Sequence, residues 1–205
     1  MPRKTKEEAE KTRLRILSNA LTLFVKKGYE NTTFIDIAEK LNMTKGAVYW
    51  HFKSKNELLG ALLEEALNRF SRTLSERMEG REPTFVAVTD MLVEMAERIV
   101  AEKKRREFFM LMQVGLKWTK AELAELAKKL IAQRIGGPYE AVAESVREDI
   151  AAGRIRSGVD VDEVASSVMA VWDGIIRRKI EGFLVSDMTS TLRNAFAALW
   201  RGIKI

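Results

Sequence analysis

The sequence predicts an all-α protein of about nine to ten helices, with a helix-turn-helix region near its N-terminus and a larger helical domain after it. Apolar residues recur at three- and four-residue spacing along nearly the whole chain, which is the period of an amphipathic helix. No stretch alternates apolar and polar residues as a strand of any length would. Glycine and proline separate the periodic segments, as at Gly80 to Pro83 and at Gly136 to Pro138. We therefore expect an N-terminal domain over residues 1–55 and a C-terminal domain over residues 56–205.

Residues 1–55 carry all of the excess positive charge of the chain. They hold 12 Lys and Arg against 6 Asp and Glu, whereas residues 56–205 hold 23 of each sign, so the net charge of +6 belongs to the first block. Confinement of the basic residues to one block favours an anionic partner over a merely solvated surface. Because there is no cysteine and no apolar run of about 20 residues, we expect a cytoplasmic protein without a disulfide or a membrane span.

The first predicted helix spans about Glu7 to Lys27 and ends at Gly28, since glycine is common directly after a helix C-terminus. Residues 1–6 show no apolar period, and we expect a frayed terminus there, although a basic arm can also reach a neighbouring DNA groove. The expected buried stripe of this helix consists of Leu14, Leu17, Ala20, Leu21 and Phe24.

The pattern of residues 32–55 predicts two short helices joined by a tight turn at Asn42 and Met43. Thr33 and Thr44 are placed to cap them. In the second helix only Val48 and Phe52 have the spacing of inward residues. A short helix with two apolar anchors and an otherwise free face is typical of a helix that lies in the major groove of DNA.

A long helix is expected from about Ser54 to Met78, with Glu57 completing a capping-box pattern. It would join the two domains, either as a strut or as an element that transmits motion. The charged run from Glu102 to Glu107 is expected to be a solvated corner, and Phe108 to Trp118 a fully buried helix. Further helices are expected over residues 84–101, 120–134, 139–152, 161–184 and 188–203.

The last two predicted helices carry apolar stripes wider than one core contact requires. Paired with their symmetry mates they would form a four-helix interface, and the alternative is that they only close the core of one protomer. We expect a homodimer, because a helix-turn-helix domain usually binds two half-sites. The candidate interface residues are Val164, Val168, Val171, Trp172, Ile175, Leu192, Phe196 and Leu199.

The sequence does not indicate an enzyme. His51 is the only histidine, so neither an HExxH zinc site nor a serine–histidine–aspartate triad can be assembled. There is no GxGxxG after a strand and no GxxxxGK[ST] loop. The acidic residues lie beside Lys and Arg on the outer faces of amphipathic helices. We expect no catalytic residue, no metal and no cofactor.

The run TKGAVYWHFKSKNELL resembles the signature of the TetR family of one-component repressors. The block from KTRLRILSNALTLFVKKGYENTTFIDIAEKLNMT onward is similar to the DNA-binding domain of that family, and the match covers roughly the first quarter to third of the chain. The resemblance implies double-stranded operator DNA as a partner and a C-terminal pocket whose small-molecule effector releases the DNA. GAVYWHF followed by KNELL is also similar to the repressors of multidrug efflux pumps, which favours a small hydrophobic effector.

The start of the second short helix holds the candidate base contacts. A lysine can donate to guanine O6 and N7 and an alanine can touch the methyl group of thymine. A glycine would allow close approach of the DNA. These candidates are Thr44, Lys45, Gly46 and Ala47.

Five further residues are candidates for contacts to the DNA backbone. The resemblance implies phosphate contacts for Tyr49 and His51, and backbone clamps at Thr33 and Lys55. Trp50 could pack on a sugar or shield Phe52.

Methionine and aromatic residues suggest an adaptable apolar cavity in the C-terminal domain, since seven of the nine methionines follow residue 56. Two alternatives stay open. One is a regulator of the same fold that senses a fatty acid or acyl-CoA, with Lys103 to Arg106 at the pocket mouth. The other is a DNA-binding dimer with no effector, which a solid C-terminal domain would favour. The candidate lining residues are Met95, Phe108, Phe109, Met112, Trp118, Met169 and Trp172.

Overall fold

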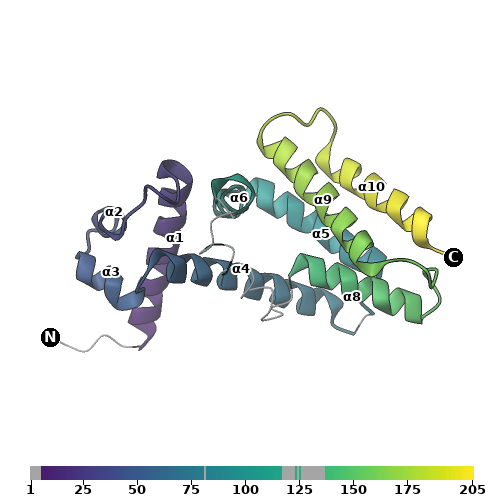
Figure 1. The fold of residues 1–205 in the computed structure, drawn as a ribbon, viewed down its shortest axis with the longest axis horizontal. Coiled ribbons are helices and arrows are strands. Elements are labelled where there is room, and N and C mark those ends of the chain that lie inside the picture. Colours follow the sequence, from purple (N-terminus) through teal and green to yellow (C-terminus); the bar gives the residue numbers. More distant parts are fainter. Residues whose placement is uncertain (1–5, 81, 117–122, 124, 126–136) are drawn as a thin grey trace. The chain divides into compact units, whose positions relative to one another are not determined.

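The computed structural model describes residues 6–80, 82–116, 123, 125 and 137–205. In these residues every regular element is a helix (Figure 1), and the β-type pairing among them is one isolated bridge between Ile155 and Lys204. The all-α fold predicted from the sequence is confirmed. The elements are α1 (Lys6–Lys27), α2 (Phe34–Lys40), α3 (Lys45–His51), α4 (Lys55–Met78), α5 (Phe85–Ala101), α6 (Lys103–Met110), the π-helical turn η1 (Leu111–Gly115), α8 (Pro138–Ala151), α9 (Val161–Ile180) and α10 (Met188–Ile203).

The chain forms two compact units. Unit 1 comprises residues 1–66 and 104–133, and unit 2 comprises residues 67–103 and 134–205. The boundary between them falls inside α4, so this helix contributes residues to both units. The functional division at residue 55, with DNA binding before it and effector binding and dimerisation after it, stays a prediction.

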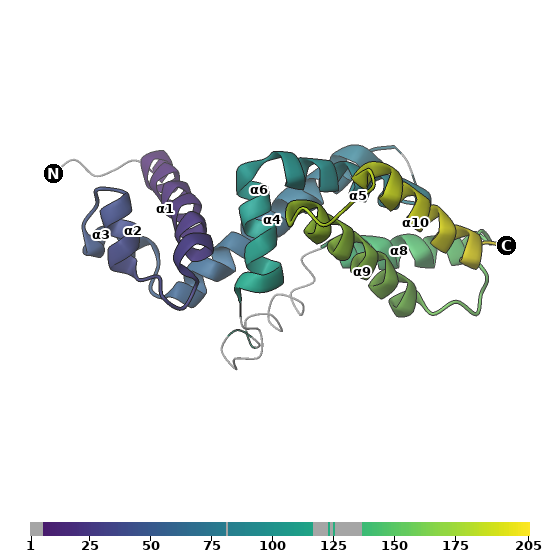
Figure 2. The same cartoon turned by 90° about the horizontal axis from the view of Figure 1, so that it is seen from above.

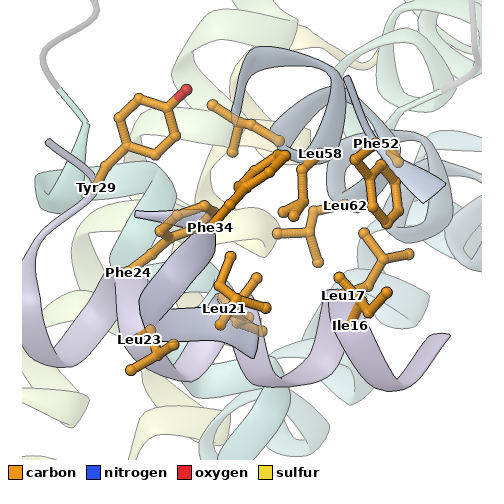
Figure 3. Close-up of a cluster of buried hydrophobic side chains, with 14 of the residues drawn as sticks. Ile16, Leu17, Leu21, Leu23, Phe24, Tyr29, Phe34, Phe52, Leu58 and Leu62 are labelled. Atoms are coloured by element: carbon orange, nitrogen blue, oxygen red, sulfur yellow. The ribbon is translucent and has the colours of Figure 1, made fainter. Parts of the chain in front are cut away.

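One apolar cluster holds the helices of unit 1 together (Figure 3). Burial of a large apolar side chain contributes roughly 1.5–3 kcal/mol, so this cluster is the main source of stability for the short helices α2 and α3. The cluster combines residues from α1, α2, α3, α4 and η1, each less than a tenth exposed. They include Ile16, Leu17, Leu21, Phe24, Phe34, Val48, Phe52, Leu58, Leu62 and Leu111.

Two sequence predictions are wrong and a third is only partly right. Leu14 is 43% exposed, because the buried face of α1 is centred on Ile16 and Ala20 and Leu14 lies about 160° around the helix from Ile16. Of the charged run from Glu102 to Glu107, only Glu102 forms an exposed corner between α5 and α6, because helix α6 already begins at Lys103. The apolar segment after it is not fully buried, since η1 interrupts the α-helix and Val114 is 52% exposed.

Helices α5, α8, α9 and α10 pack against one another in unit 2, and both views show α9 beside α10 (Figures 1 and 2). The indole N–H of Trp172 in α9 donates to the carbonyl oxygen of Leu92 in α5 at 2.8 Å. Asp149 is fully buried and accepts the N–H of Phe85 at 2.9 Å and Nε of Arg154 at 2.6 Å. The polar groups enclosed by these helices are therefore paired.

Helix α9 ends at Ile180 and not at the predicted Leu184. Gly182 has φ of +79°, the left-handed conformation that ends many helices. The N–H of Phe183 donates back to the carbonyl oxygen of Arg178 at 2.8 Å and closes the helix end.

Candidate nucleic-acid interface

The two helices of the helix-turn-helix region begin at the predicted threonines. Oγ1 of Thr33 accepts the N–H of Asp36 at 3.2 Å, while the Asp36 carboxylate accepts the N–H of Thr33 at 2.7 Å, which together form a capping box. Oγ1 of Thr44 accepts the N–H of Ala47 at 3.2 Å. Between the helices Asn42 has φ of +51°, a conformation that asparagine tolerates better than most residues. These local contacts determine where α3 begins.

Two side chains anchor α3, as its spacing predicted. Val48 and Phe52 are 0% and 1% exposed, and the guanidinium of Arg13 lies over the Phe52 ring at 5.3 Å. The ring of Trp50 is 66% exposed and meets that of His51 edge-on, with centroids 4.5 Å apart. The other outward residues of this region are Thr44, Lys45, Gly46 and Tyr49, all exposed, and Ala47, which is partly buried.

Gly46 has no structural reason within unit 1 to be a glycine. A Cβ added there would meet Oγ1 of Thr44 at 3.9 Å, an ordinary van der Waals distance. Gly46 lies in the first turn of α3, where alanine would favour the helix by up to about 1 kcal/mol. Packing within unit 1 does not account for the glycine, and the predicted close approach of DNA to Gly46 stays a prediction.

A surface pocket of about 230 Å³ lies beside α3 at the N-termini of α2 and α4. It brings together the predicted phosphate contact Tyr49 and the predicted backbone clamps Thr33 and Lys55, whereas His51 does not line it. Hydroxyl groups and an ammonium group are the donors that hold phosphate oxygens in protein–DNA complexes. The complete lining is Glu30, Thr32, Thr33, Phe34, Tyr49, Ser54 and Lys55.

Packing positions the tyrosine of this pocket. The ring of Tyr49 packs edge-on against that of Phe34, with centroids 4.8 Å apart, and Phe34 is itself buried. Nζ of Lys45 lies 5.5 Å from the Tyr49 ring centroid, within cation–π range. A buried neighbour and a cation therefore flank the Tyr49 ring next to the pocket.

Lys55 has a structural role that the sequence did not predict. Its ammonium group donates to the carbonyl oxygens of Tyr29 at 2.9 Å and Glu30 at 3.0 Å, and it lies 4.8 Å from the ring centroid of Tyr29. The hydroxyl of Tyr29 in turn donates to Asn56 at 2.6 Å. Lys55 thus ties the loop before α2 to the start of α4, and two of its three protons point at protein.

Asp36 is a site residue that sequence reasoning missed. Hydrogen bonds from Lys27, then from the N–H and hydroxyl of Thr33, lower the pKa of the Asp36 carboxyl to about 2. Both donors of Thr33 are therefore directed at Asp36, and a phosphate beside Thr33 would compete with this carboxylate. The spacing of a threonine and an aspartate three residues later was the available signal.

The predicted effector contacts are distributed over both units. Phe108, Phe109 and Met112 belong to unit 1, where Phe109 is buried and the other two pack against the apolar cluster. Met95, Met169 and Trp172 belong to unit 2, and Trp172 is 5% exposed in the helical core. Trp118 lies outside the described residues. That these residues line one pocket stays a prediction.

Most of the predicted interface residues are buried inside the single protomer. Their side chains have little surface left for a second chain. The buried residues are Val164, Val168, Trp172, Leu192 and Phe196, and the partly exposed ones are Val171, Ile175 and Leu199.

Among the residues that the structure describes, no helix is long and apolar enough to cross a membrane. No group of three or more His, Cys, Asp or Glu side chains in that part of the chain could hold a metal ion.

Comparison with known proteins assigns the N-terminal region to a family. Residues 16–62 match the model of the bacterial regulatory proteins of the tetR family. The HTH-type transcriptional regulator TtgR of Pseudomonas putida is 31% identical over 183 residues, which cover 87% of this chain and 84% of that protein.

Two solved structures show the same fold over nearly the whole chain. NalD of Pseudomonas aeruginosa, the secondary repressor of the MexAB-OprM multidrug efflux pump, matches with a TM-score of 0.74 and 24% identity over 97% of this chain and 98% of its own. The transcriptional regulator FadR of Bacillus subtilis, in complex with stearoyl-CoA, matches with a TM-score of 0.77 and 18% identity over 93% of this chain and 98% of its own.

Proposed function

The chain belongs to the TetR family of DNA-binding transcriptional regulators, and from this premise we propose that it is a homodimeric repressor which a small hydrophobic effector releases from operator DNA. The relatives that establish the family are transcriptional regulators and not enzymes. An operator-binding role places the protein with the chromosome, in the cytoplasm.

The observation that carries the proposal is the pocket beside α3. It gathers Thr33, Tyr49 and Lys55 at the edge of a helix whose outer face is exposed. We assign phosphate contacts to these three residues and to His51, and a sugar contact to Trp50. The outer face of α3 would then lie in the major groove, with Thr44, Lys45, Gly46 and Ala47 at the base edges.

The relatives support a hydrophobic effector but leave the two alternatives open. NalD represses a multidrug efflux pump, whereas FadR of the same fold is bound to stearoyl-CoA. An acyl-CoA sensor would use the basic run from Lys103 to Arg106. The ammonium group of Lys104 already donates to the carbonyl oxygen of Ser18 at 2.7 Å, which weakens that alternative.

We place the dimer contact on the outward faces of α9 and α10. Gly174 stands inside α9, where glycine costs about 1 kcal/mol relative to alanine, and a Cβ there would meet nothing within 4 Å in the described protomer. Gly202, in the last turn of α10, likewise has nothing within 4 Å of its Cβ position. Close approach of a second chain gives both glycines a purpose. Val171, Ile175 and Leu199 are then the predicted interface residues that still have surface to contribute.

The proposal is tested by selecting operator duplexes from a random library with the full-length chain. We expect an inverted repeat whose half-site centres lie about 34–36 Å apart, or a multiple of this, because each protomer inserts one α3. A dimer that makes 6–10 phosphate contacts should lose roughly 10³–10⁵ in affinity between 50 and 200 mM salt.

Tyr49→Phe removes only the hydroxyl group at the pocket and should weaken binding to the selected duplex. Tyr139→Phe is the matched control, since Tyr139 is also exposed and lies in α8. Equal affinity of the two variants would remove Tyr49 from the phosphate contacts, and failure to enrich any repeat would reject the operator-binding dimer.

A further inference from the structure

Residues 52–54 join α3 to α4, and we call them the α3–α4 joint. Phe52 in the joint and Leu58 after it are 1% and 0% exposed, and both belong to the apolar cluster of unit 1 (Figure 3). Phe52 has an extended backbone, with φ of −140° and ψ of 127°, so the chain leaves α3 at this residue. The joint bears on DNA binding because the pocket beside α3 takes Tyr49 from one side of it and Lys55 from the other.

A side chain of α4 takes part in ending α3. If α3 continued by one more residue, the N–H of Lys53 would donate to the carbonyl oxygen of Tyr49, four positions earlier. In the structure this N–H donates to Oε2 of Glu57 at 2.6 Å. The carbonyl oxygen of Tyr49 accepts Nζ of Lys53 at 3.2 Å. Glu57 therefore takes the donor that would lengthen α3, and the Lys53 side chain compensates the carbonyl group.

The first turn of α4 determines where Glu57 lies. Its N–H donates to Oγ of Ser54 at 3.1 Å, which is one half of a capping box. In the usual capping box the acid reaches back to the N–H of the capping residue itself. Glu57 reaches one residue further, to the N–H of Lys53. An acid of α4 thus crosses the joint and holds the end of α3.

The two sides of the pocket are held by different contacts. Lys55 is bonded to the carbonyl oxygens of Tyr29 and Glu30, which lie before α2. Tyr49 is bonded through its own carbonyl oxygen to Lys53 in the joint. The spacing between Tyr49 and Lys55 therefore depends on the bonds that Lys53 makes, including the bond to Glu57.

We propose that Glu57 is a positioning residue for DNA binding, which holds Tyr49 at the spacing from Lys55 that a backbone phosphate requires. It acts through Lys53. An acid near DNA repels the phosphates, so by charge alone the removal of a carboxylate should tighten binding. The positioning role has the opposite sign, because loss of Glu57 weakens binding. This inference rests on the proposed function and adds a residue to its DNA-binding site.

Three full-length variants test the sign of this effect. Glu57→Ala removes the acceptor, whereas Glu57→Gln removes only the charge and keeps an oxygen that can accept the N–H of Lys53. Glu64→Ala is the matched control, since Glu64 is an exposed acid about two turns further along α4.

Fluorescence anisotropy at fixed salt measures the affinity of each variant for the selected duplex, at a temperature where circular dichroism shows all of them folded. Glu57→Ala should bind roughly 10- to 150-fold more weakly than the wild type, the loss expected for one hydrogen bond to a charged group. Glu57→Gln and Glu64→Ala should bind at least as tightly as the wild type. Equal losses in Glu57→Ala and Glu57→Gln would contradict the acceptor role of Glu57.

A double-mutant cycle tests whether Glu57 acts through Tyr49. Tyr49→Phe should cost less affinity in Glu57→Ala than in the wild type, because the hydroxyl group is then already displaced from the phosphate. A contribution of Glu57 to stability alone would leave the two losses additive within a factor of about two. Amide hydrogen exchange checks the contact without DNA, and exchange at Lys53 should be faster in Glu57→Ala than in Glu64→Ala.

The outcomes separate this inference from the proposed function. If the wild type enriches no duplex, the proposed function fails and the role of Glu57 fails with it. If the wild type binds and Glu57→Ala matches Glu64→Ala in affinity, only the role of Glu57 is rejected. Additive losses in the cycle, or equal exchange at Lys53 in the two variants, would reject the route from Glu57 through Lys53 to Tyr49.

Discussion

The fold of unit 1 does not require a glycine at position 46, and we predict that DNA approaches this residue closely. Its Cβ space is open in unit 1, so Gly46→Ala should fold with equal or slightly higher stability. The added methyl group would stand between α3 and the base edges, and operator affinity should fall by roughly 1–3 kcal/mol. Fluorescence anisotropy with the selected duplex measures the loss. The control is Gly158→Ala, at a loop glycine with equally open space, which should bind operator DNA as the wild type does. If Gly46→Ala also binds with wild-type affinity, the DNA does not approach the first turn of α3.

Lys55 combines a predicted phosphate contact with a structural one. Lys55→Ala should weaken all DNA sequences alike, and it should also destabilise the protein by on the order of 1 kcal/mol because it removes the bonds to the carbonyl oxygens of Tyr29 and Glu30. Lys45→Ala should instead relax base preference with little change in stability. Urea denaturation with Lys40→Ala as the control checks the first effect. No difference in midpoint between the Lys55 and Lys40 variants would mean that the carbonyl contacts contribute nothing.

Asp36 makes the free energy of unfolding depend on pH in the acid range. Its pKa in the folded protein is about 2, below the unfolded value of 3.8, so its ionised form stabilises the fold above pH 3.8. This contribution is lost as the pH falls from about 5 towards 2. Asp36→Asn should therefore be less stable than the wild type at pH 6 and should show a smaller loss between pH 5 and 2. Urea titrations at each pH measure both quantities, and parallel pH profiles of the two proteins would contradict the assignment.

Helix α9 has one face buried inside the protomer and another, partly exposed face on which we place the dimer contact. Its buried face holds Val168 and Trp172, and the indole N–H of Trp172 is bonded inside the protomer, so a charge at either position would unfold unit 2 before it could report on a dimer. Val171 is partly exposed one residue away and is the better test.

Val171→Asp should convert the dimer to a folded monomer, because it would place a charge in an apolar contact. Sedimentation velocity and circular dichroism measure the two properties. Val86→Asp, the same change at a 45% exposed valine of α5, should leave the dimer intact. A dimeric Val171→Asp would move the interface away from this face of α9.

At the scale of the whole molecule, the proposed effector and the operator DNA must each lower the affinity of the protein for the other by the same factor. Helix α4 contributes to both compact units, and we predict that an apolar effector tilts it and changes the spacing of the two α3 helices from the required 34–36 Å. A typical coupling is about 1–3 kcal/mol, and linkage requires operator DNA to weaken the effector by the same factor.

Triclosan serves as the probe for a small hydrophobic effector. Its affinity for the protein, measured by titration at fixed salt with and without the selected duplex, gives this coupling. Equal affinity in the two titrations would show that the compound is not an inducer. If no small molecule tested shows coupling, the DNA-binding dimer without an effector becomes the better account.

The local features of this protein followed from its sequence because they depend on residues only a few positions apart. Helical periods, the caps at Thr33 and Thr44 and the two anchors Val48 and Phe52 all act within one or two helical turns. The family signature lies in that same stretch, so the candidate DNA contacts could be named before the structure. In α1 the predicted stripe included the exposed Leu14 and omitted the buried Ile16, since neighbouring helices decide where a buried face is centred.

Contacts between distant residues were decided by the tertiary structure alone. Lys55 meets a carbonyl oxygen 26 positions away and Lys104 meets one 86 positions away, and no local pattern specifies either. The apolar stripe of α9 likewise predicted burial but not the partner, because the hydrophobic effect is non-directional and a valine gains equally from its own core or from a second chain. In the structure α9 packs against α5, α8 and α10, Val168 is buried within the protomer, and Val171 stays partly exposed.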